Sequence, residues 1–446
     1  MKKLSAVITL IFIFSTIFSL AASAQSGYAY TEEVLAGFAP GWEAIQADES
    51  VISLAPGEKA GEVRFAWLTT ADKKEQFLLA DNSSMAESDF YEVTVADAIS
   101  DYKSNNVTVS GLEEGNTYYY SYTKNGAWSK IYSFTVQTSD EFTFLYVSDA
   151  QIGRSGDETL EEVLVRDTCG WNYTVDKMLT AYPDAAFAVS GGDQFQSPDS
   201  LTQMKAYLSP EKLRSLPVAN TIGNHDSEAT LYGDIFNNPN EVFELFGDEA
   251  GTGYYYSYGD ALFITVNSNN TSLTDTARVI RKAIKAYPDA KWRIVTMHHN
   301  PYSASLADGE YSEERLIFSA LYDCYDIDLV LSGHDHLYSR TNTMYGGKIT
   351  DGEGTVYLQS SSASGSNYDP LPEETASFIV SSFDVRVPTY TAFTVSGNSL
   401  SGTTYRTDTD EIIDSFEIGD NTADSQSNVF AVVFSMIRTL FSMMSF

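Results

Sequence analysis

Between residues 141 and 336, short apolar runs typical of strands alternate with longer segments typical of helices. The first run, FTFLYVSD at 142–149, is followed by a helix-like segment at 158–182 and by a second run, AAFAVSGGD, at 185–193. A chain that alternates in this way buries its strands in a sheet and covers that sheet with its helices. In such layered domains the functional side chains stand at the carboxyl ends of the strands. The pattern therefore predicts an α/β domain with its site at one sheet edge.

Residues 45–138 have the different pattern of a small antiparallel β-sandwich. GEVRFAWLTT (61–70) and FYEVTVA (90–96) alternate in strand fashion, and Asn125-Gly126 is a dipeptide typical of a two-residue hairpin turn. This region contains no histidine or cysteine. We therefore assign it a supporting role rather than a chemical one. Antiparallel strands return between residues 355 and 418, where they complete the α/β domain.

The first residues predict export. Lys2 and Lys3 precede an apolar stretch and an Ala-Ser-Ala cleavage site at 22–24, so residues 1–24 are interpreted as a secretory signal peptide of the short bacterial kind. Residues 25–44 would then form an N-terminal linker. The expected location of the protein is outside the cell or at the cell envelope.

The last residues, 421–446, combine a polar linker with the apolar segment NVFAVVFSMIRTLFSMMSF at 428–446. This tail is predicted to be an amphipathic helix in contact with a membrane interface, or else a helix docked on the protein itself. The chain has two cysteines, Cys169 and Cys324. They could form one disulfide in an exported protein or remain as two buried thiols.

The net charge restricts the partners of this chain. Its 61 acidic residues outnumber its 27 basic ones and leave a formal charge of −34. Nucleic-acid phosphates would be repelled, so we expect no nucleic-acid binding. A small phosphorylated substrate would gain no steering from the overall field. Its site must create a local positive field, which bound metal ions usually supply.

All five histidines of the chain follow strand-like runs, beside carboxylate and amide side chains. The complete set is Asp149, Gln151, Asp193, Asn224, His225, His298, His299, His334 and His336. Imidazole, carboxylate and amide oxygen are ligands that suit manganese, iron or zinc, and there are enough of them for two ions. Two metals about 3.5–4 Å apart can clamp both oxygens of an in-line displacement at phosphorus. The set therefore predicts two-metal phosphoryl chemistry.

This ordered set resembles the pattern D-x-H/G, GD, GNH[DE], H and GHxH of the calcineurin-like metallophosphoesterase superfamily. The matching stretches are VSDAQIG, SGGDQFQ, IGNHD, TMHHNP and LSGHDH. FAWLTT and VSGLEEGNTYYYSY are similar to the fibronectin type III-like N-terminal domain of secreted bacterial members of the purple acid phosphatase type. The resemblance implies a two-domain protein, with an all-β sandwich at 45–138 and a four-layer αββα metallophosphoesterase domain at 139–420.

The resemblance also implies a set of metal ligands. Asp193 would bridge two metal ions, whose identity is left open among manganese, iron and zinc. At the first metal the ligands would be Asp149 and His336, with Gln151 in the place of a further ligand. At the second metal they would be Asn224, His298 and His334.

The resemblance further implies how catalysis would proceed. A metal-bound hydroxide would attack phosphorus in line, and His225 would protonate the leaving oxygen. Asp226 would orient His225, because an imidazole acid needs a partner on its other nitrogen. His299 would contact the substrate. Tyr302 would line the substrate pocket, with aromatic packing as the alternative.

Two positions depart from the family pattern. Gln151 stands where many phosphoesterases have histidine, and an amide oxygen is a weaker ligand. Gln196 stands where purple enzymes have the tyrosine that binds ferric iron, so we expect a colourless protein. The run SSSASGSNYDP at 360–370 is interpreted as a surface loop, with a substrate-binding loop as the alternative.

Three functions compete on this evidence. The first is an exported, metal-dependent phosphoesterase that resembles acid phosphatases and hydrolyses phosphomonoesters. The second is a phosphodiesterase or nucleotide hydrolase on the same metal core. The third is a catalytically weak, metal-depleted binding protein at the cell envelope, an idea supported by Gln151.

Overall fold

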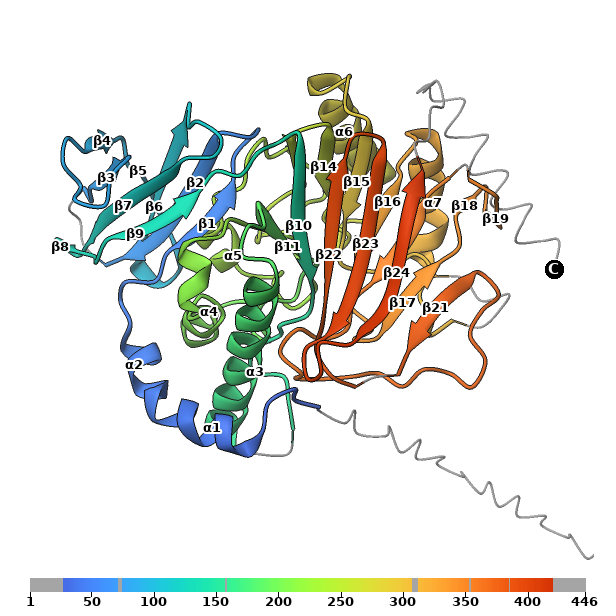
Figure 1. Ribbon diagram of the computed structural model, residues 1–446, viewed down its shortest axis with the longest axis horizontal. Coiled ribbons are helices and arrows are strands. Elements are labelled where there is room, and N and C mark those ends of the chain that lie inside the picture. Colours follow the sequence, from blue (N-terminus) through green and yellow to red (C-terminus); the bar gives the residue numbers. More distant parts are fainter. Residues whose placement is uncertain are drawn as a thin grey trace, which may run out of the picture.

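The computed structural model describes residues 27–70, 74–156, 159–306, 312–352, 354–384 and 386–419. The predicted signal peptide and apolar tail lie outside these ranges. Figure 1 shows a small strand-rich domain beside a larger domain in which helices flank two sheets. Within the described ranges, no helix is both long and apolar enough to cross a membrane.

The small domain is a sandwich of two antiparallel sheets, ordered β1-β2-β6-β5 and β4-β3-β7-β8, with β9 also paired to β7. Its strands are β1 (Ser53–Pro56), β2 (Glu62–Thr69), β3 (Phe77–Ala80), β4 (Asp89–Tyr91), β5 (Thr94–Asp97), β6 (Lys103–Ser110), β7 (Thr117–Lys124), β8 (Ala127–Trp128) and β9 (Tyr132–Thr135). Aromatic rings fill the space between the sheets, where Phe65 lies 4.7 Å from Phe77 and 5.0 Å from Tyr120. The predicted all-β sandwich is confirmed.

The hairpin between β7 and β8 turns at the predicted dipeptide. Lys124 pairs with Ala127, and the two residues between them, Asn125 and Gly126, have φ angles of 51° and 83°. A two-residue turn of this type needs positive φ at both central positions, which asparagine and glycine tolerate best.

The first sheet of the large domain is ordered β12-β11-β10-β22-β23-β24. Its strands are β10 (Glu141–Val147), β11 (Phe187–Ser190), β12 (Val218–Asn220), β22 (Thr389–Ser396), β23 (Ser399–Arg406) and β24 (Ile412–Gly419). Strands β10, β11 and β12 are parallel, and the last three strands extend the sheet in antiparallel fashion.

The second sheet is ordered β13-β14-β15-β16-β20-β17-β21. Its strands are β13 (Tyr254–Tyr258), β14 (Ala261–Thr265), β15 (Trp292–Thr296), β16 (Leu329–Ser332), β17 (Tyr338–Thr341), β20 (Val356–Gln359) and β21 (Ile379–Phe383). Strands β14, β15, β16 and β20 are parallel. The small ribbon of β18 (Met344–Tyr345) and β19 (Lys348–Ile349) lies outside this sheet.

Helices cover the outer face of each sheet. On one side are α3 (Leu160–Ala181) and α4 (Leu201–Tyr207), and on the other are α6 (Leu273–Ala286) and α7 (Glu313–Cys324) (Figure 1). Aromatic side chains pack between the two sheets, with the ring of Phe144 5.1 Å from Phe263 and 4.9 Å from Phe393. These layers confirm the predicted αββα fold. Cys169 on α3 and Cys324 on α7 are separate buried thiols in opposite helical layers.

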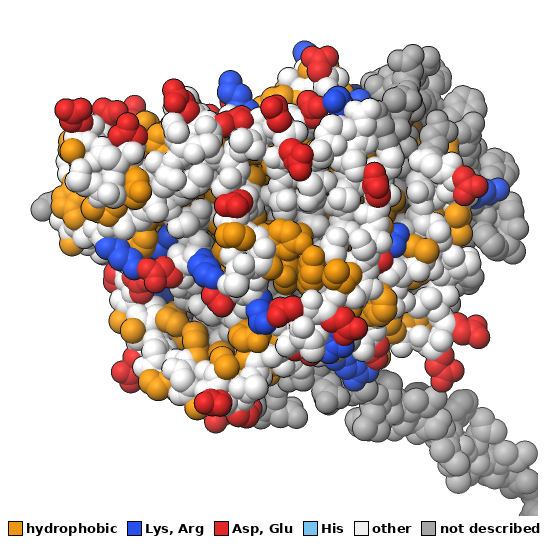
Figure 2. Space-filling view, in the orientation of Figure 1, with side chains coloured by type: hydrophobic (Ala, Val, Ile, Leu, Met, Phe, Trp, Pro, Cys, Tyr) orange, Lys and Arg blue, Asp and Glu red, His pale blue; other side chains and the backbone are white. Residues whose placement is uncertain are grey.

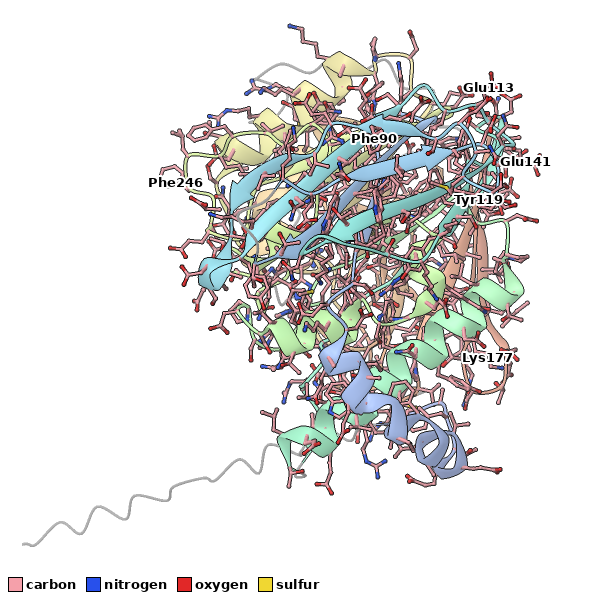
Figure 3. All side chains as sticks on the ribbon, turned by 90° about the vertical axis from the view of Figure 1, so that its left-hand side faces the viewer. Phe90, Glu113, Tyr119, Glu141, Lys177 and Phe246 are labelled. Atoms are coloured by element: carbon pink, nitrogen blue, oxygen red, sulfur yellow. The ribbon has the colours of Figure 1, made fainter. Side chains whose placement is uncertain are left out.

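The residues before the sandwich are helical where a linker was predicted. They form α1 (Glu32–Phe38), the 3-10 turn η1 (Ala39–Gly41) and α2 (Trp42–Ala47). Helix α1 contacts α3, and α2 contacts α4. Figure 3, which looks onto the sandwich, shows this segment running beside α3, where Lys177 is labelled.

The sandwich packs against segments on both sides of the GNHD motif. Ser104 donates through its hydroxyl to the Asp234 carbonyl at 2.6 Å on α5 (Leu231–Ile235), and Arg64 donates to the Asn238 carbonyl at 2.9 Å. Tyr120 donates to the Arg214 carbonyl at 2.9 Å on η3 (Glu211–Arg214). The remaining 3-10 turn, η2 (Ile99–Asp101), lies before β6. These contacts are consistent with a supporting role for the sandwich.

Candidate metal centre

The predicted ligands come together at one edge of the two facing sheets. From the first sheet, Asp149 follows β10, Asp193 follows β11 and Asn224 follows β12. From the second sheet, His298 follows β15, and His334 and His336 follow β16. Parallel strands end at a common edge, and the inter-sheet core holds the two edges face to face. The side chains therefore converge although almost 190 residues separate the first from the last.

Five residues of this cluster have a left-handed backbone. The φ angles are 51° at Asp149, 35° at Gln151, 52° at Asp193, 78° at His334 and 51° at His336. Such conformations cost about 1–3 kcal/mol each in non-glycine residues and concentrate at functional sites. Hydrogen bonds between the loop that follows β10 and the loop that follows β11 hold the first three of these residues. The Asp149 N–H donates to the Gly192 carbonyl at 3.0 Å, and the Gln151 N–H donates to the Asp193 carbonyl at 2.7 Å.

Glycines make room for the two buried carboxylates. A Cβ atom at Gly223 would overlap the carboxylate of Asp193, and one at Gly333 would overlap the carboxylate of Asp149. Glycine is the residue that lets these backbone segments approach the carboxylates so closely. The glycines of GNHD and GHDH thus support the site because they carry no side chain that would overlap these carboxylates.

Asp149, Asp193 and His336, the first donor group, place one ligand atom each within 4.8 Å of one another, and all three are buried. Nδ1 of His336 faces the Asn367 carbonyl at 3.2 Å, which places the ring proton there, and Nε2 faces Oδ1 of Asp149 at 3.4 Å. Burial lowers the pKa of His336 to about 3, so this ring is neutral. A nitrogen lone pair that faces a carboxylate is repelled unless a cation lies between them. The first donor group therefore fits a metal ion.

Asp193, Asn224, His298 and His334 form the second donor group, which shares Asp193 with the first. Oδ1 of Asn224 lies 3.0 Å from Nε2 of His298 and 3.0 Å from Nδ1 of His334. Nε2 of His298 also lies 3.2 Å from Oδ2 of Asp193, while its Nδ1 faces the Gly191 carbonyl at 3.0 Å. Four donor atoms of the kinds that bind manganese, iron or zinc thus converge.

The second donor group favours a positive charge beside Asp193. Burial opposes protonation of His298, but the carboxylate of Asp193 outweighs it and raises the pKa of His298 to about 10. Burial also raises the pKa of the Asp149 carboxyl. A positive charge beside these buried carboxyl groups would stabilise their ionised forms, and metal binding at neutral pH would release the His298 proton.

Gln151 presents an unsatisfied acceptor to the same site. Its Nε2 lies 3.4 Å from Oδ2 of Asp193, and its buried Oε1 has no hydrogen-bond partner within the described ranges. A buried carbonyl-type oxygen without a donor is costly in a folded protein. A cation at the first donor group would give this oxygen a partner, so the amide is compatible with a ligand role.

The structure corrects the partner expected for His225. Asp226 is fully buried, and its carboxylate accepts hydrogen bonds from the N–H groups of Gly223 at 2.8 Å and Gln194 at 3.0 Å. Instead, Nδ1 of His225 lies 3.1 Å from Nε2 and 3.2 Å from the carbonyl oxygen of Gln196. Asp226 is thus a turn-forming residue, and the prediction that it orients His225 is wrong. The D-x-x-Q spacing after Asp193 was the signal that could have identified Gln196.

The two residues predicted to contact the substrate, His299 and Tyr302, lie in different places in the structure. His299 lies beside the second donor group, with Nδ1 2.9 Å from the Ser268 hydroxyl and its ring 4.4 Å from the ring of His334. Tyr302 is only 1% exposed, and its ring packs 4.5 Å from the ring of Tyr357. The prediction that Tyr302 lines the substrate pocket is wrong, because the ring belongs to the core beneath the sheet.

The segment 360–368 is a buried support rather than a surface loop. The Ser362 hydroxyl donates to the Asp149 carbonyl at 2.8 Å, and Ala363 N–H donates to the Ser148 carbonyl at 2.8 Å. The Asn367 carbonyl fixes the ring of His336 as described above. Its serine-rich composition suggested exposure, but the small side chains allow the segment to pack tightly beneath the site.

Metal binding should raise the thermal stability of this protein. In 1 mM EDTA we expect a lower melting temperature than with Mn²⁺, because the cation relieves the contacts between Asp149, Asp193 and the neutral ring of His336. A ligand present at a hundred times its Kd stabilises the folded state by about 2.7 kcal/mol per site, which corresponds to several degrees. Scanning fluorimetry measures the shift, with NaCl at matched ionic strength as the control. Equal melting temperatures in EDTA and Mn²⁺ would contradict this account of the site.

Comparison with known proteins agrees with these features. The family model described as "Purple acid Phosphatase, N-terminal domain" matches residues 50–136, and that described as "Calcineurin-like phosphoesterase" matches residues 142–338. Purple acid phosphatase 23 of Arabidopsis thaliana is 31% identical over 153 residues, which cover 30% of this chain and 31% of that protein. The chain thus spans about a third of the length of this curated relative.

Similar solved structures include purple acid phosphatase PPD1 from yellow lupin (Lupinus luteus) seeds, which has the same fold. It is 15% identical with a TM-score of 0.66, covering 85% of this chain and 76% of that one. GAP50, the anchor in the inner membrane complex of Plasmodium, is 14% identical with a TM-score of 0.46, covering 67% of this chain and 95% of that one. Residues 142–338, with the ordered motifs at the sheet edge, thus belong to the calcineurin-like phosphoesterases, and residues 50–136 match the N-terminal domain of purple acid phosphatases.

Proposed function

We propose that this protein is an exported phosphoesterase that uses two metal ions to hydrolyse phosphomonoesters. The observation that carries the proposal is the pair of donor groups that share the carboxylate of Asp193. Bound metal ions would supply positive charge to the phosphate oxygens and activate water as the nucleophile. This local charge matters in a chain of net charge −34, because the rest of the protein repels an anionic substrate.

His225 is suited to act as the general acid. Its backbone N–H donates to Oδ1 of Asp193 at 2.9 Å, which anchors His225 beside the residue that both donor groups share. Gln196 occupies its Nδ1, which leaves Nε2 as the nitrogen that faces a substrate. His225 is partly exposed, as a residue that meets a substrate must be. The ring of His299 lies 4.4 Å from the ring of His334, which supports a role for His299 in contacting the phosphate or the leaving group.

A phosphodiesterase on the same core is the nearest alternative. Both reactions use the same metal ligands and differ in how many ester oxygens the pocket must accept. Comparing rates on 4-nitrophenyl phosphate and bis(4-nitrophenyl) phosphate separates the two. The proposal expects the monoester to react faster, and faster hydrolysis of the diester would favour the alternative.

A metal-depleted binding protein is the alternative from another functional class. The experiment that decides is the metal content of the full chain, purified without chelator. About two equivalents of manganese, iron or zinc per chain are expected. One equivalent or none, unchanged after metal is added back, would mean that Gln151 weakens the first donor group too far.

Replacing Asn224 or His336 with Ala should abolish phosphomonoester hydrolysis while the fold is retained. Each change removes one predicted metal ligand, so the remaining ligands of that donor group would bind the metal ion more weakly. Initial rates on 4-nitrophenyl phosphate measure the loss, and circular dichroism checks the fold. Asn116→Ala is the matched control, because Asn116 is exposed in a sandwich turn. If Asn224→Ala and His336→Ala kept full activity, the site would be assigned wrongly.

The proposal also includes export and membrane contact, which rest on residues 1–24 and 428–446. The leader predicts that the exported protein begins at Gln25, which N-terminal sequencing reads directly. The apolar tail would hold the protein at a membrane interface by burying its apolar face.

A further inference from the structure

We infer that Tyr28 and Asp167 are positioning residues for the first donor group. Neither touches a predicted metal ligand through its side chain. Each holds a loop that carries such ligands, and the inference therefore rests on the proposed two-metal function. Tyr28 follows the predicted cleavage site by four residues, and Asp167 lies on α3, outside every motif.

Asp167 organises the turn that follows Gln151. Its carboxylate is fully buried, and Oδ2 accepts hydrogen bonds from the N–H groups of Gly153 at 2.8 Å and Arg154 at 3.0 Å. Oδ1 accepts a hydrogen bond from the Ser155 hydroxyl. A carboxylate can accept from several donors at once, whereas an amide would turn two hydrogens toward groups that also donate. Asp167 thus closes the turn in a way that asparagine cannot reproduce.

This turn bears directly on the ligands. Arg154 N–H donates to the Gln151 carbonyl at 3.1 Å, so the turn begins at Gln151 itself. Ile152 N–H donates to the Gln194 carbonyl at 3.3 Å, which ties the same segment to the loop of Asp193. Because Gln151 has a φ angle of 35°, its backbone needs restraint from both sides. Asp167 supplies that restraint through the turn that follows Gln151.

Tyr28 links the turn to the loop behind His336. Its hydroxyl lies 2.7 Å from the Ser155 hydroxyl and donates to Oδ1 of Asp167 at 3.1 Å. A Cβ at Gly365 would lie 3.0 Å from the Tyr28 ring and 2.7 Å from the Gly27 carbonyl. Tyr368 also donates to the Gly27 carbonyl at 2.9 Å. The N-terminal segment therefore packs between the 153–155 turn and the loop at 360–368.

The second of these loops reaches the first donor group at two points. Ser362 donates to the Asp149 carbonyl at 2.8 Å, and the Asn367 carbonyl fixes the ring of His336. Tyr28 thus sits against the supports of Asp149, Gln151 and His336 together. Within the described ranges, none of its contacts involves Asn224, His298 or His334, the ligands that belong to the second donor group alone. The inference therefore predicts a selective effect on one of two metal ions.

Tyr30 offers a matched control within the same segment. Its hydroxyl donates to the Arg166 carbonyl at 3.1 Å, and its ring stacks 5.0 Å from the Tyr28 ring. Tyr30→Phe and Tyr28→Phe each remove one hydroxyl from a buried or half-buried tyrosine of the N-terminal segment. Only Tyr28→Phe removes a contact with the 153–155 turn, so any difference between the variants reports on that turn.

The experiment is titration of Mn²⁺ into the full chain after its metals have been stripped with EDTA, followed by calorimetry and by melting in EDTA. Tyr28→Phe should weaken one of the two Mn²⁺ sites by about tenfold, which is the low end of the effect of outer partners of metal ligands. The other Mn²⁺ site should be unchanged, and Tyr30→Phe should leave both unchanged. Asp167→Asn should weaken the same site more strongly than Tyr28→Phe.

Other outcomes would overturn the inference in distinguishable ways. Wild-type Mn²⁺ affinities in Tyr28→Phe would overturn the positioning role and leave the proposed function intact. Equal weakening in Tyr28→Phe and Tyr30→Phe, with equal losses of melting temperature, would show a general effect on stability instead. Absence of Mn²⁺ binding by the wild-type chain would overturn the proposed two-metal function on which the inference rests.

Discussion

Replacing Asp193 with Asn should lower phosphomonoester hydrolysis by about 10³-fold or more. Removing one charged partner from a buried network costs about 3–5 kcal/mol, and Asp193 is the residue shared by both donor groups. The change also weakens the acceptor for the His225 N–H, which lies 2.9 Å from Oδ1. We expect the metal content to fall from two equivalents to at most one. Initial rates and elemental analysis of the same preparation measure both effects.

The control for this variant is Asp260→Asn. Asp260 is an exposed aspartate whose carboxylate lies 2.7 Å from the Lys291 ammonium group, away from the ligand-bearing loops. It should keep both its metal content and its hydrolysis rate. An Asp193→Asn enzyme with two metals and full activity would show that the shared carboxylate is not the centre of the site.

Replacing His225 with Ala should produce a loss that depends on the leaving group. A general acid contributes about 10²–10⁴-fold when the departing oxygen is strongly basic. An alkyl phosphate such as glycerol phosphate should therefore lose activity by at least about 10²-fold. 4-Nitrophenyl phosphate should lose much less, because its leaving group departs without a proton. Ratios of kcat/KM for the two substrates give the measurement.

His299→Ala serves as the comparison for His225→Ala. His299 stands beside the second donor group, where it can contact the phosphate that both substrates share. Its loss should affect both substrates to a similar degree. If His225→Ala also lowered both rates equally, His225 would be a phosphate-binding residue and the acid would have to be sought elsewhere.

The surface charge of the molecule explains why the expected losses of activity should be confined to substitutions at the metal centre. Figure 2 shows acidic side chains spread over the visible face of the molecule, with fewer basic ones between them. Surface charges of this kind are screened by salt over about 10 Å. The substrate phosphate therefore depends on the metal centre and its histidines rather than on the general field of the protein.

Local features of the fold could be predicted because short-range rules decide them. The Asn125-Gly126 turn follows from the positive φ angles that these two residues tolerate. The layering of helices on sheets follows from the alternation of strand-like and helix-like runs, and the resemblance to the family implied its αββα form. The clustering of Asp149, Asp193 and His336 follows from their places at the ends of parallel strands.

Short-range rules could not predict which side chains contact one another within the site. Asp226 follows His225 in the chain, yet it turns toward backbone N–H groups and leaves His225 to Gln196. Tyr302 follows a metal motif but enters the core. Adjacent residues in loops point in different directions, and neither composition nor spacing states which direction each one takes.

Residue type and order along the chain were enough to predict the family, the two-domain fold and the kinds of side chain in the candidate metal centre. The distances between those ligands were decided by tertiary structure, because Asp149 and His336 come from different sheets whose separation is set by the aromatic core between them. The same packing wedges Tyr28 between two loops from distant parts of the sequence. Contacts across such separations depend on how whole layers stack, which no local pattern encodes.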